Sequence, residues 1–493
     1  MSRPKVRRWF LNVSLACITA STLAAMGQPS AVAAADKSAT LSMGAATVSI
    51  TPAKPAPLLG QMRLRVSQSV ESPVTAAALA LETRQGDQVV DQVIFVVCDL
   101  GVLRGGVIDK VREHAKDRVP DFDLRKLVVS ATHTHSAPTM IRPGYDLPKD
   151  GVIQPEEYVE LLVDRLTEVI VEAWSSRKPG LVGWGLGHAV VGQNRRAVYA
   201  DGHAQMYGKT DDDGFRGLEG YEDHGVEVLF FWNQDQKLIA TAVNVACPAQ
   251  EAEHNLAISA DYWHEVRELL RARHGDDLVV LGWIGAAGDQ TPRQMIRKEA
   301  EERMRKLRGL TRLEELARRI DRGWEEAYEC ACKEKHGQVA LSHVASTIHL
   351  PPREVTAKEY AEAKAQVEKH AKSPGSQGRM GWHQRIVNRF EQQKAGPSEP
   401  YPMELHVVRL GDVAIATNPF ELYTDYGIQI KARSPALLTF VIQLAGEGTY
   451  VPTERAVRGG GYSAVVQSNS VGPKGGQVLV ERTVEAIRTL WSK

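Results

Sequence analysis

Hydrophobic residues recur along this chain with two different periods, and the alternation of these periods predicts an α/β protein. Short apolar runs rich in Val, Ile, Phe and Ala end at Gly, Pro or Asp, which is typical of buried β-strands. Longer segments repeat apolar residues every three or four positions, which is typical of amphipathic helices. We predict strands at 45–50, 74–82, 88–98, 124–131, 182–188, 226–232, 239–246, 278–283, 403–410 and 413–417. We predict helices at 107–116, 156–174, 261–274, 354–370, 384–393 and 476–491, with one or two charged surface helices between 293 and 335.

Strands that alternate with helices predict a mixed β-sheet core with flanking helices. The sequence contains no internal repeat and no low-complexity linker, so we expect one domain over residues 36–493. The hydrophobic content of 43% and the charged content of 24% are those of an ordinary globular protein. The 60 Lys and Arg residues balance the 60 Asp and Glu residues, which gives no support to a nucleic-acid partner.

Residues 1–35 have the pattern of an export signal. Basic residues in the first eight positions precede a mildly apolar stretch at 11–26, and Ala31-Val32-Ala33 offers a cleavage site. Arg7 and Arg8 also resemble the centre of a twin-arginine signal. An uncleaved membrane anchor fits less well, because the apolar stretch is short and contains Ser and Thr. We therefore predict a periplasmic or secreted protein, and we expect no later segment to span a membrane.

The first candidate chemistry follows the apolar run at 127–129, which predicts a buried strand that ends in a loop. In an extended segment, residues two apart point the same way, so His133 and His135 are expected to project together. The C-terminal end of a strand is where α/β enzymes commonly place their chemistry. Two imidazoles there can bind a metal, or one can bind it while the other transfers protons. The alternative is a pair of polar histidines at the end of a loop.

Further segments with groups capable of chemistry lie at predicted strand ends or in loops. They contain Asn194 and Arg195, Cys247, Asp289 and Thr291, and Glu421 with Tyr450 and Tyr462. The most specific marks are Thr-His-Thr-His-Ser at 132–136, Ala-Gly-Asp-x-Thr-Pro at 287–292 and Asn-Pro-Phe-Glu at 418–421. With two tyrosines twelve positions apart, this set resembles the N-terminal catalytic domain of the neutral ceramidase family. The resemblance covers about residues 44–463.

The resemblance implies a zinc amidase that cleaves the N-acyl bond of a sphingolipid. It implies that His133, Glu421 and Tyr450 are zinc ligands and that His135 lies beside the bound water without binding the metal. It further implies that Arg195 and Tyr462 hold the substrate carbonyl or the oxyanion that develops from it. The chemistry is consistent, because a catalytic zinc needs about three protein ligands and one open position for water.

Two positions depart from the family pattern. Cys247 stands where the family has a second zinc histidine, so it is either a thiolate ligand or a strand-end cysteine without metal, in which case His254 is a nearby substitute. Thr291 stands where ceramidases have a serine; it keeps the hydroxyl and adds a methyl group that restricts its rotamers. We also expect the C-terminal immunoglobulin-like domain of true ceramidases to be absent.

The sequence therefore predicts an exported zinc-dependent hydrolase that cleaves the C–N bond of a small-molecule or lipid amide. The main alternative is a non-catalytic relative that keeps the fold and binds a ligand or a metal structurally. A metal-dependent phosphoester or sulfoester hydrolase is a third hypothesis. It is weaker because such sites gather several aspartates around two metals, and only Asp99, Asp261 and Asp289 are candidates.

Overall fold

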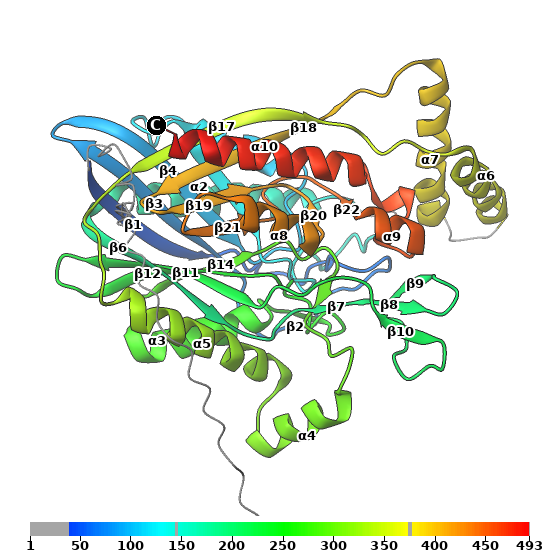
Figure 1. Cartoon of the computed structure of the whole chain (residues 1–493), viewed down its shortest axis with the longest axis horizontal. Coiled ribbons are helices and arrows are strands. Elements are labelled where there is room, and N and C mark those ends of the chain that lie inside the picture. Colours follow the sequence, from blue (N-terminus) through cyan, green and yellow to red (C-terminus); the bar gives the residue numbers. More distant parts are fainter. Residues whose placement is uncertain (1–38, 143–145, 373–376, 493) are drawn as a thin grey trace, which may run out of the picture. The chain divides into compact units, whose positions relative to one another are not determined.

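Two β-sheets pack face to face between layers of helices (Figure 1). The computed structural model describes residues 39–142, 146–372 and 377–492, all within one compact unit. The larger sheet has the strand order β14-β12-β11-β6-β1-β3-β4-β5, with β16 paired to β1, and the smaller sheet has the order β17-β18-β19-β21. Most neighbouring strands are antiparallel, whereas β5 pairs with β4, β14 with β12 and β21 with β19 in parallel. The predicted mixed sheet with flanking helices is thus confirmed, whereas the predicted export signal lies outside the described residues.

The strands of the larger sheet are β1 (Ala39–Ser49), β3 (Thr75–Gln85), β4 (Gln88–Cys98), β5 (Leu127–Ala131), β6 (Lys178–His188), β11 (Gly225–Asn233), β12 (Leu238–Val245), β14 (Val279–Ile284) and β16 (Gln338–Val339). Those of the smaller sheet are β17 (Leu341–Leu350), β18 (Tyr401–Leu410), β19 (Val413–Thr417) and β21 (Leu438–Ile442). The helices are α1 (Val107–Ala115), α2 (Pro155–Ser175), α3 (Tyr262–His274), α4 (Lys298–Arg308), α5 (Arg312–Ala331), α6 (Ala357–Ala371), α7 (Gln377–Ala395), α8 (Thr424–Arg433), α9 (Glu454–Gly459) and α10 (Pro473–Trp491).

Strict alternation along the strands explains why the two sheets pack as layers. In β3, Ala76, Ala78 and Ala80 belong to the apolar cluster that contains residues of α1 and α2. Leu79 and Leu81, whose side chains point to the opposite face of the strand, belong to a second cluster that lies between the two sheets. Helices α3 and α5 cover the other half of the larger sheet, and α8 and α10 cover the outer face of the smaller one (Figure 1). Both faces of most central strands are therefore buried, as their continuous apolar runs indicate.

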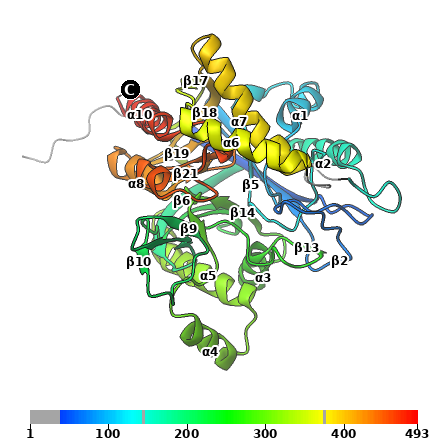
Figure 2. The same ribbon diagram turned by 90° about the vertical axis from the view of Figure 1, so that its right-hand side faces the viewer.

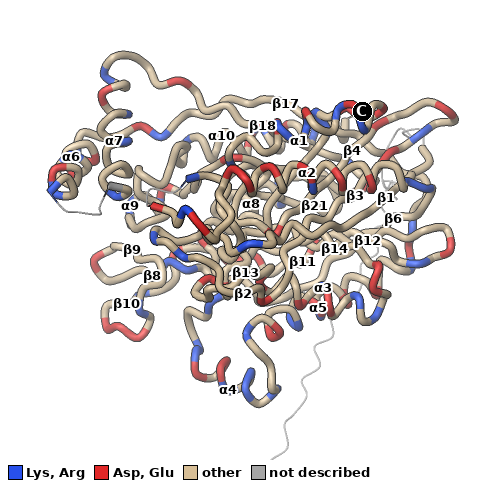
Figure 3. The backbone as a smooth tube through the Cα atoms, turned by 180° about the vertical axis from the view of Figure 1, so that it is seen from behind, with Lys and Arg blue, Asp and Glu red and all other residues tan. Residues whose placement is uncertain are grey.

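The helices outside these layers are charged or lie at the periphery. Lys and Arg alternate with Asp and Glu along α4, which buries none of its residues (Figure 3). This agrees with the charged surface helices predicted between 293 and 335. Helices α6 and α7 pack against each other over a small apolar cluster of their own (Figure 2). None of the described helices combines the length and the apolar character that crossing a membrane requires.

Backbone hydrogen bonds join the loops that follow the C-terminal ends of five strands. The loop after β5 contacts the loop after β12 through Ala249 N–H and Thr132 C=O (3.2 Å). The backbone N–H of Gln443, which follows β21, donates to the carbonyl oxygen of Ile284 at the end of β14 (3.0 Å). The N–H of Gly288, in the loop after β14, donates to the carbonyl oxygen of Leu422, in the segment after β19 (2.8 Å). Short ladders complete the assembly: β2 (Ser69–Val70) with β13 (Ala257–Ile258), β7 (Gln193–Asn194) with β15 (Gln290–Thr291), and β20 (Glu421–Leu422) with β22 (Tyr450–Val451). A second small sheet, of β8 (Arg196–Tyr199), β9 (Ala204–Met206) and β10 (Phe215–Leu218), lies beside them. Segments far apart in sequence are thereby held at one place.

Candidate active site

One cavity of about 480 Å³ collects most of the predicted site residues. It is lined by His133, His135, Arg195, Glu421, Tyr450 and Tyr462, which come from five separate segments of the chain. The two histidines reach it from the loop after β5, where their ring centroids lie 4.9 Å apart. The backbone at His133 is left-handed, with φ of 65°, so the pair meets in a turn rather than along the straight strand that alternation predicts.

His133 and Glu421 face each other at the centre of the cavity wall. Nδ1 of His133 contacts the carbonyl oxygen of Gly101, and because a carbonyl only accepts hydrogen bonds, Nδ1 carries a proton. The other ring nitrogen, Nε2, lies 3.1 Å from Oε2 of Glu421. Burial raises the pKa of Glu421, but the charge and hydrogen bond of His133, together with Arg195 and Tyr450, outweigh burial and bring that pKa to about 2. Glu421 is therefore an ionised, partly buried carboxylate.

Tyr450 stands beside Glu421 because β20 and β22 pair in register at these two residues. Burial raises the pKa of the Tyr450 phenol well above its ordinary value, and the Glu421 carboxylate adds to the increase. Arg195 is buried and donates from Nη2 to the Tyr450 hydroxyl (3.2 Å) and to the carbonyl oxygen of Gly288 (2.9 Å). Its Nη1 donates to Tyr207 (3.3 Å), and its Nε–H has no partner among the described residues.

His135 is held by two residues that the sequence analysis did not identify. Gln250 accepts from Nη1 of Arg195 through Oε1 (3.3 Å), so its amide nitrogen is the atom that faces Nε2 of His135 at 3.0 Å. An amide nitrogen only donates, so Nε2 of His135 is unprotonated and Nδ1 donates to Oε2 of Glu253 at 2.8 Å. Burial lowers the pKa of His135 more than the Glu253 hydrogen bond raises it, which agrees with a neutral ring. Both missed residues follow directly after the strand that ends near Cys247, and that position is the signal that could have identified them.

Tyr462 closes the cavity on the side of the smaller sheet. Its ring meets that of Tyr450 edge-on, with centroids 6.0 Å apart, and stacks on Trp382 at 6.2 Å. The side chain is 39% exposed, and its hydroxyl has no hydrogen-bond partner in the described part of the chain. The partial desolvation of the ring, with the nearby Glu421 carboxylate, raises the pKa of Tyr462, which keeps the phenol protonated and able to donate at neutral pH.

The structure places the two divergent residues outside the lining of this cavity. Cys247 is fully buried in the apolar cluster beneath α3 and α5, and its thiol faces the carbonyl oxygen of Pro248 at 3.6 Å. Burial raises the pKa of the Cys247 thiol well above its ordinary value. Thr291 is also fully buried, and its hydroxyl accepts the backbone N–H of Arg293 (3.1 Å). Metal binding by Cys247 and a catalytic role of Thr291 therefore stay predictions. The buried positions of the two side chains, outside the cavity lining, do not favour either role.

The other predicted polar residues have structural partners. Asp289 accepts from the side chain of Asn194 (2.7 Å) and from the backbone and hydroxyl of Thr424 (3.0 and 2.8 Å), which ties the loop after β14 to α8. Asp99 forms a buried two-pronged ion pair with Arg267 at 2.7 and 2.9 Å. These aspartates are dispersed rather than gathered around one position.

The donor set fits a bound cation. Because Nδ1 of His133 is committed to Gly101, Nε2 is the ring nitrogen that faces Oε2 of Glu421, at 3.1 Å. Two such atoms approach closely only when a proton or a metal lies between them. Ligands of a tetrahedral zinc would be about 3.4 Å apart. Among the described residues, no group of three or more His, Cys, Asp or Glu side chains is placed to hold a metal. The Tyr450 phenol, which hydrogen-bonds with Glu421, is a further oxygen beside this pair.

Two solved structures share this fold. Neutral ceramidase from Pseudomonas aeruginosa has a TM-score of 0.64 and 17% sequence identity, over 92% of this chain and 75% of its own. A ceramidase complexed with C2 has a TM-score of 0.62 and 16% identity, also over 92% of this chain and 75% of that one. No family model and no curated protein matches the sequence. The chain therefore has a neutral ceramidase-like fold, as its motifs predicted, and at this low identity the likeness concerns the fold.

Proposed function

We propose that this protein is an exported zinc-dependent hydrolase that cleaves the C–N amide bond of an N-acyl compound, either a sphingolipid or another lipid or small-molecule amide. The observation that carries the proposal is the convergence of His133, Glu421 and Tyr450 with His135 and Arg195 in one cavity. The ceramidase-like fold supports the same reaction class. In this cavity, residues that can bind a cation (His133, Glu421 and Tyr450) lie beside a residue that can transfer protons (His135).

The residues that would hold zinc are His133, Glu421 and Tyr450. Zinc bound there would act as a Lewis acid toward the substrate carbonyl and would lower the pKa of a water molecule. The hydrogen bond from Nδ1 of His133 to Gly101 fixes the ring so that Nε2 presents its lone pair, as is usual for metal-binding histidines. The hydrogen bond between Arg195 and Tyr450 holds the phenol in place.

His135 has the geometry of a general base. Its Nε2 lone pair faces the cavity, and the proton on Nδ1 is directed at the Glu253 carboxylate, which stabilises the imidazolium that forms when Nε2 takes a proton. The amide of Gln250 occupies this lone pair in the free protein and has to give way to the attacking water. Once protonated, Nε2 can return the proton to the nitrogen of the departing amine.

Tyr462 and Arg195 supply the positive electrostatic environment for the oxygen that becomes negative during attack. The Tyr462 hydroxyl, which has no hydrogen-bond partner among the described residues, is a donor at the cavity wall. The Nη groups of Arg195 are committed to Tyr450, Gly288, Tyr207 and Gln250, so Arg195 acts through its charge and by positioning its neighbours. Pre-oriented donors and fixed charges of this kind commonly supply a large share of the barrier reduction in acyl transfer.

The decisive experiment is hydrolysis of a panel of N-acyl amides by the purified mature protein, before and after chelation and with zinc restored. The proposal predicts amide hydrolysis that is lost with a chelator, restored by zinc and abolished in His135→Gln. The positions of Cys247 and Thr291 outside the cavity favour the second candidate, a non-catalytic relative that binds a ligand or a metal. Zinc binding without turnover of any amide in the panel would support that candidate.

A further inference from the structure

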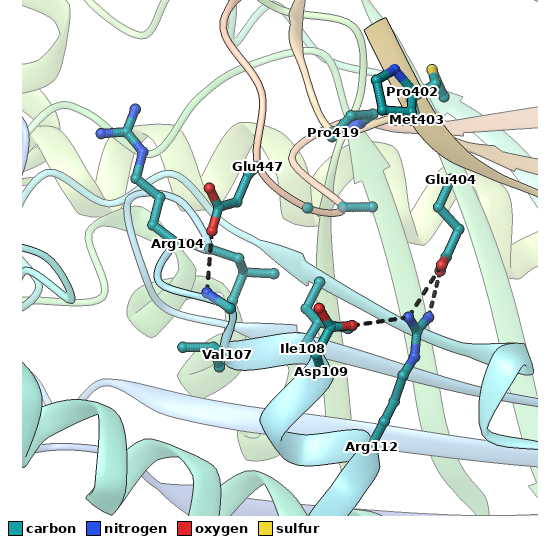
Figure 4. A pocket seen from close by; sticks show the side chains of 14 residues that line it. Arg104, Val107, Ile108, Asp109, Arg112, Pro402, Met403, Glu404, Pro419 and Glu447 are labelled. Carbon is teal, nitrogen blue, oxygen red and sulfur yellow. Dashed lines mark hydrogen bonds and ion pairs between the residues drawn. The ribbon is translucent and has the colours of Figure 1, made fainter. Parts of the chain in front are cut away.

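Arg104 is a charged residue of the active-site cavity for which the described part of the chain provides no partner. Arg104 lies in the loop after β4, two residues beyond the cavity residue Val102, and is partly buried. Within the described residues its guanidinium makes no hydrogen bond and no ion pair. It also borders a second cavity of about 260 Å³, but in Figure 4 its guanidinium points away from Asp109, Arg112 and Glu404, which pair with one another there.

Every other charged residue of the active-site cavity is compensated. Glu421 faces His133, and Glu253 is bound by His135 and by Arg293. Arg195 has four hydrogen-bond partners. Among the described residues that line this cavity, the charge that remains uncompensated is therefore the positive charge of Arg104.

The surroundings of Arg104 fit an amphipathic ligand. Arg104 and the Tyr462 phenol line the same cavity. The same cavity is lined by Leu59, Met62 and Met206, which offer apolar and flexible contact surface. A half-buried guanidinium has lost part of its hydration, and a carboxylate can replace that hydration through two parallel hydrogen bonds.

We propose that Arg104 binds an anionic group of the substrate, so that the preferred substrates are N-acyl amides that carry a carboxylate close to the scissile bond. This inference rests on the proposed function, because it names the substrate class of the same site. The reaction adds the OH of water to the acyl carbon and a proton to nitrogen as the C–N bond breaks. Its products are a carboxylic acid and an amine, one of which keeps the carboxylate bound by Arg104.

The test compares N-dodecanoylglycine, which has its carboxylate on the amine side, with glutaric acid monododecylamide, which has it on the acyl side, and with neutral N-dodecanoylethanolamine. We expect the zinc-loaded wild type to prefer at least one of the two anionic amides, and the preferred one identifies the side. In Arg104→Gln, kcat/KM for that amide should fall roughly 10- to 100-fold, with little change for the neutral amide. Arg104→Lys should lose part of the preference, because lysine keeps the charge but not the planar fork.

Arg63→Gln is the matched control, because Arg63 is an exposed cation of the neighbouring rim that binds Gln61 (3.0 Å) and does not line the cavity. It should leave the preference unchanged. A wild type without preference for either anion, or an Arg104→Gln that loses activity equally on all three amides, would overturn the inference. If Arg104→Gln does not fold, the preference of the wild type for an anionic amide and the partial loss of that preference in Arg104→Lys test the inference instead. An Arg104→Lys that keeps the full preference would then overturn it.

Calorimetric binding separates failure of this inference from failure of the proposed function. If no amide is hydrolysed, the proposed hydrolase is wrong, while binding of the two anionic amides still reports on Arg104. Weaker binding of the anionic amides to Arg104→Gln than to wild type, with equal binding of the neutral one, would support the anion site. Equal binding of all three amides to wild type would refute it.

Discussion

Gly60→Ala tests how tightly the fold positions His135. A Cβ atom at Gly60 would lie 2.3 Å from Cγ, 2.5 Å from Cβ and 2.6 Å from Nδ1 of His135. Normal contact requires the ring to retreat by about 1 Å. Such a movement stretches the hydrogen bonds of His135 to Glu253 and Gln250, which are 2.8 and 3.0 Å long. A displacement of about 1 Å in a catalytic group can lower the rate about 100-fold.

The backbone effect of this substitution has to be separated from its effect on the histidine. Gly60 has φ of +110°, so alanine there also strains the backbone by about 1–3 kcal/mol. Gly202→Ala is the control, because Gly202 has φ of +84° and nothing within 4 Å of the added Cβ. Gly60→Ala should lose at least as much stability as Gly202→Ala in urea unfolding, because it adds the clash with His135 to the backbone strain. Only Gly60→Ala should lose kcat/KM for the best amide. Activity of Gly60→Ala within threefold of wild type would refute the assigned role of His135.

Three other substitutions test separate parts of the account. Glu253→Gln keeps a partner for His135 but removes the charge that stabilises its imidazolium, so kcat should fall about 100-fold or more with folding unchanged by circular dichroism; wild-type kcat would contradict the base assignment. Burial, with the nearby His406, lowers the pKa of His343 to about 3. Below about pH 6.5, His343 is therefore protonated in the unfolded chain but not in the folded one. The free energy of unfolding should then fall by up to about 1.4 kcal/mol per pH unit as the pH drops. His343→Gln should flatten this slope in urea titrations, and an unchanged slope would assign it to other groups. Arg267→Met leaves the Asp99 carboxylate buried without its cation, so unfolding should become easier by about 3–5 kcal/mol; a loss below about 1 kcal/mol would show that water reaches Asp99.

The larger sheet could be predicted from the sequence, whereas half of the smaller sheet could not. Continuous apolar runs identify β3, β4 and β14 because both faces of these strands are buried. β17 has an irregular burial pattern and is a strand because β18 pairs with it along its whole length. β21 is a run of five residues that gains its identity from parallel pairing with β19. Pairing with a distant strand is not encoded in local periodicity, so both were missed.

The candidate site shows the same division between local signal and tertiary context. The motifs around His133 and Glu421 predicted residues that the fold brings together. At Cys247 the sequence left two roles open, a thiolate ligand and a strand-end cysteine without metal, because the direction of a side chain at a strand end depends on the turn that follows it. The left-handed turn at His133 likewise depends on the Gly101 carbonyl from another strand end. Glu253 carried no recognisable motif and owes its role to the loop that returns it to His135.

If His133 and Glu421 hold a metal for amide hydrolysis, the zinc content of the purified mature protein depends on both side chains. Wild type should contain one zinc per chain, His133→Ala and Glu421→Gln should contain none, and Cys247→Ala should keep its zinc because its thiol lies outside the cavity. Circular dichroism should show that all variants are folded. Wild type that takes up no zinc even when zinc is added, or His133→Ala that keeps its zinc, would contradict the account.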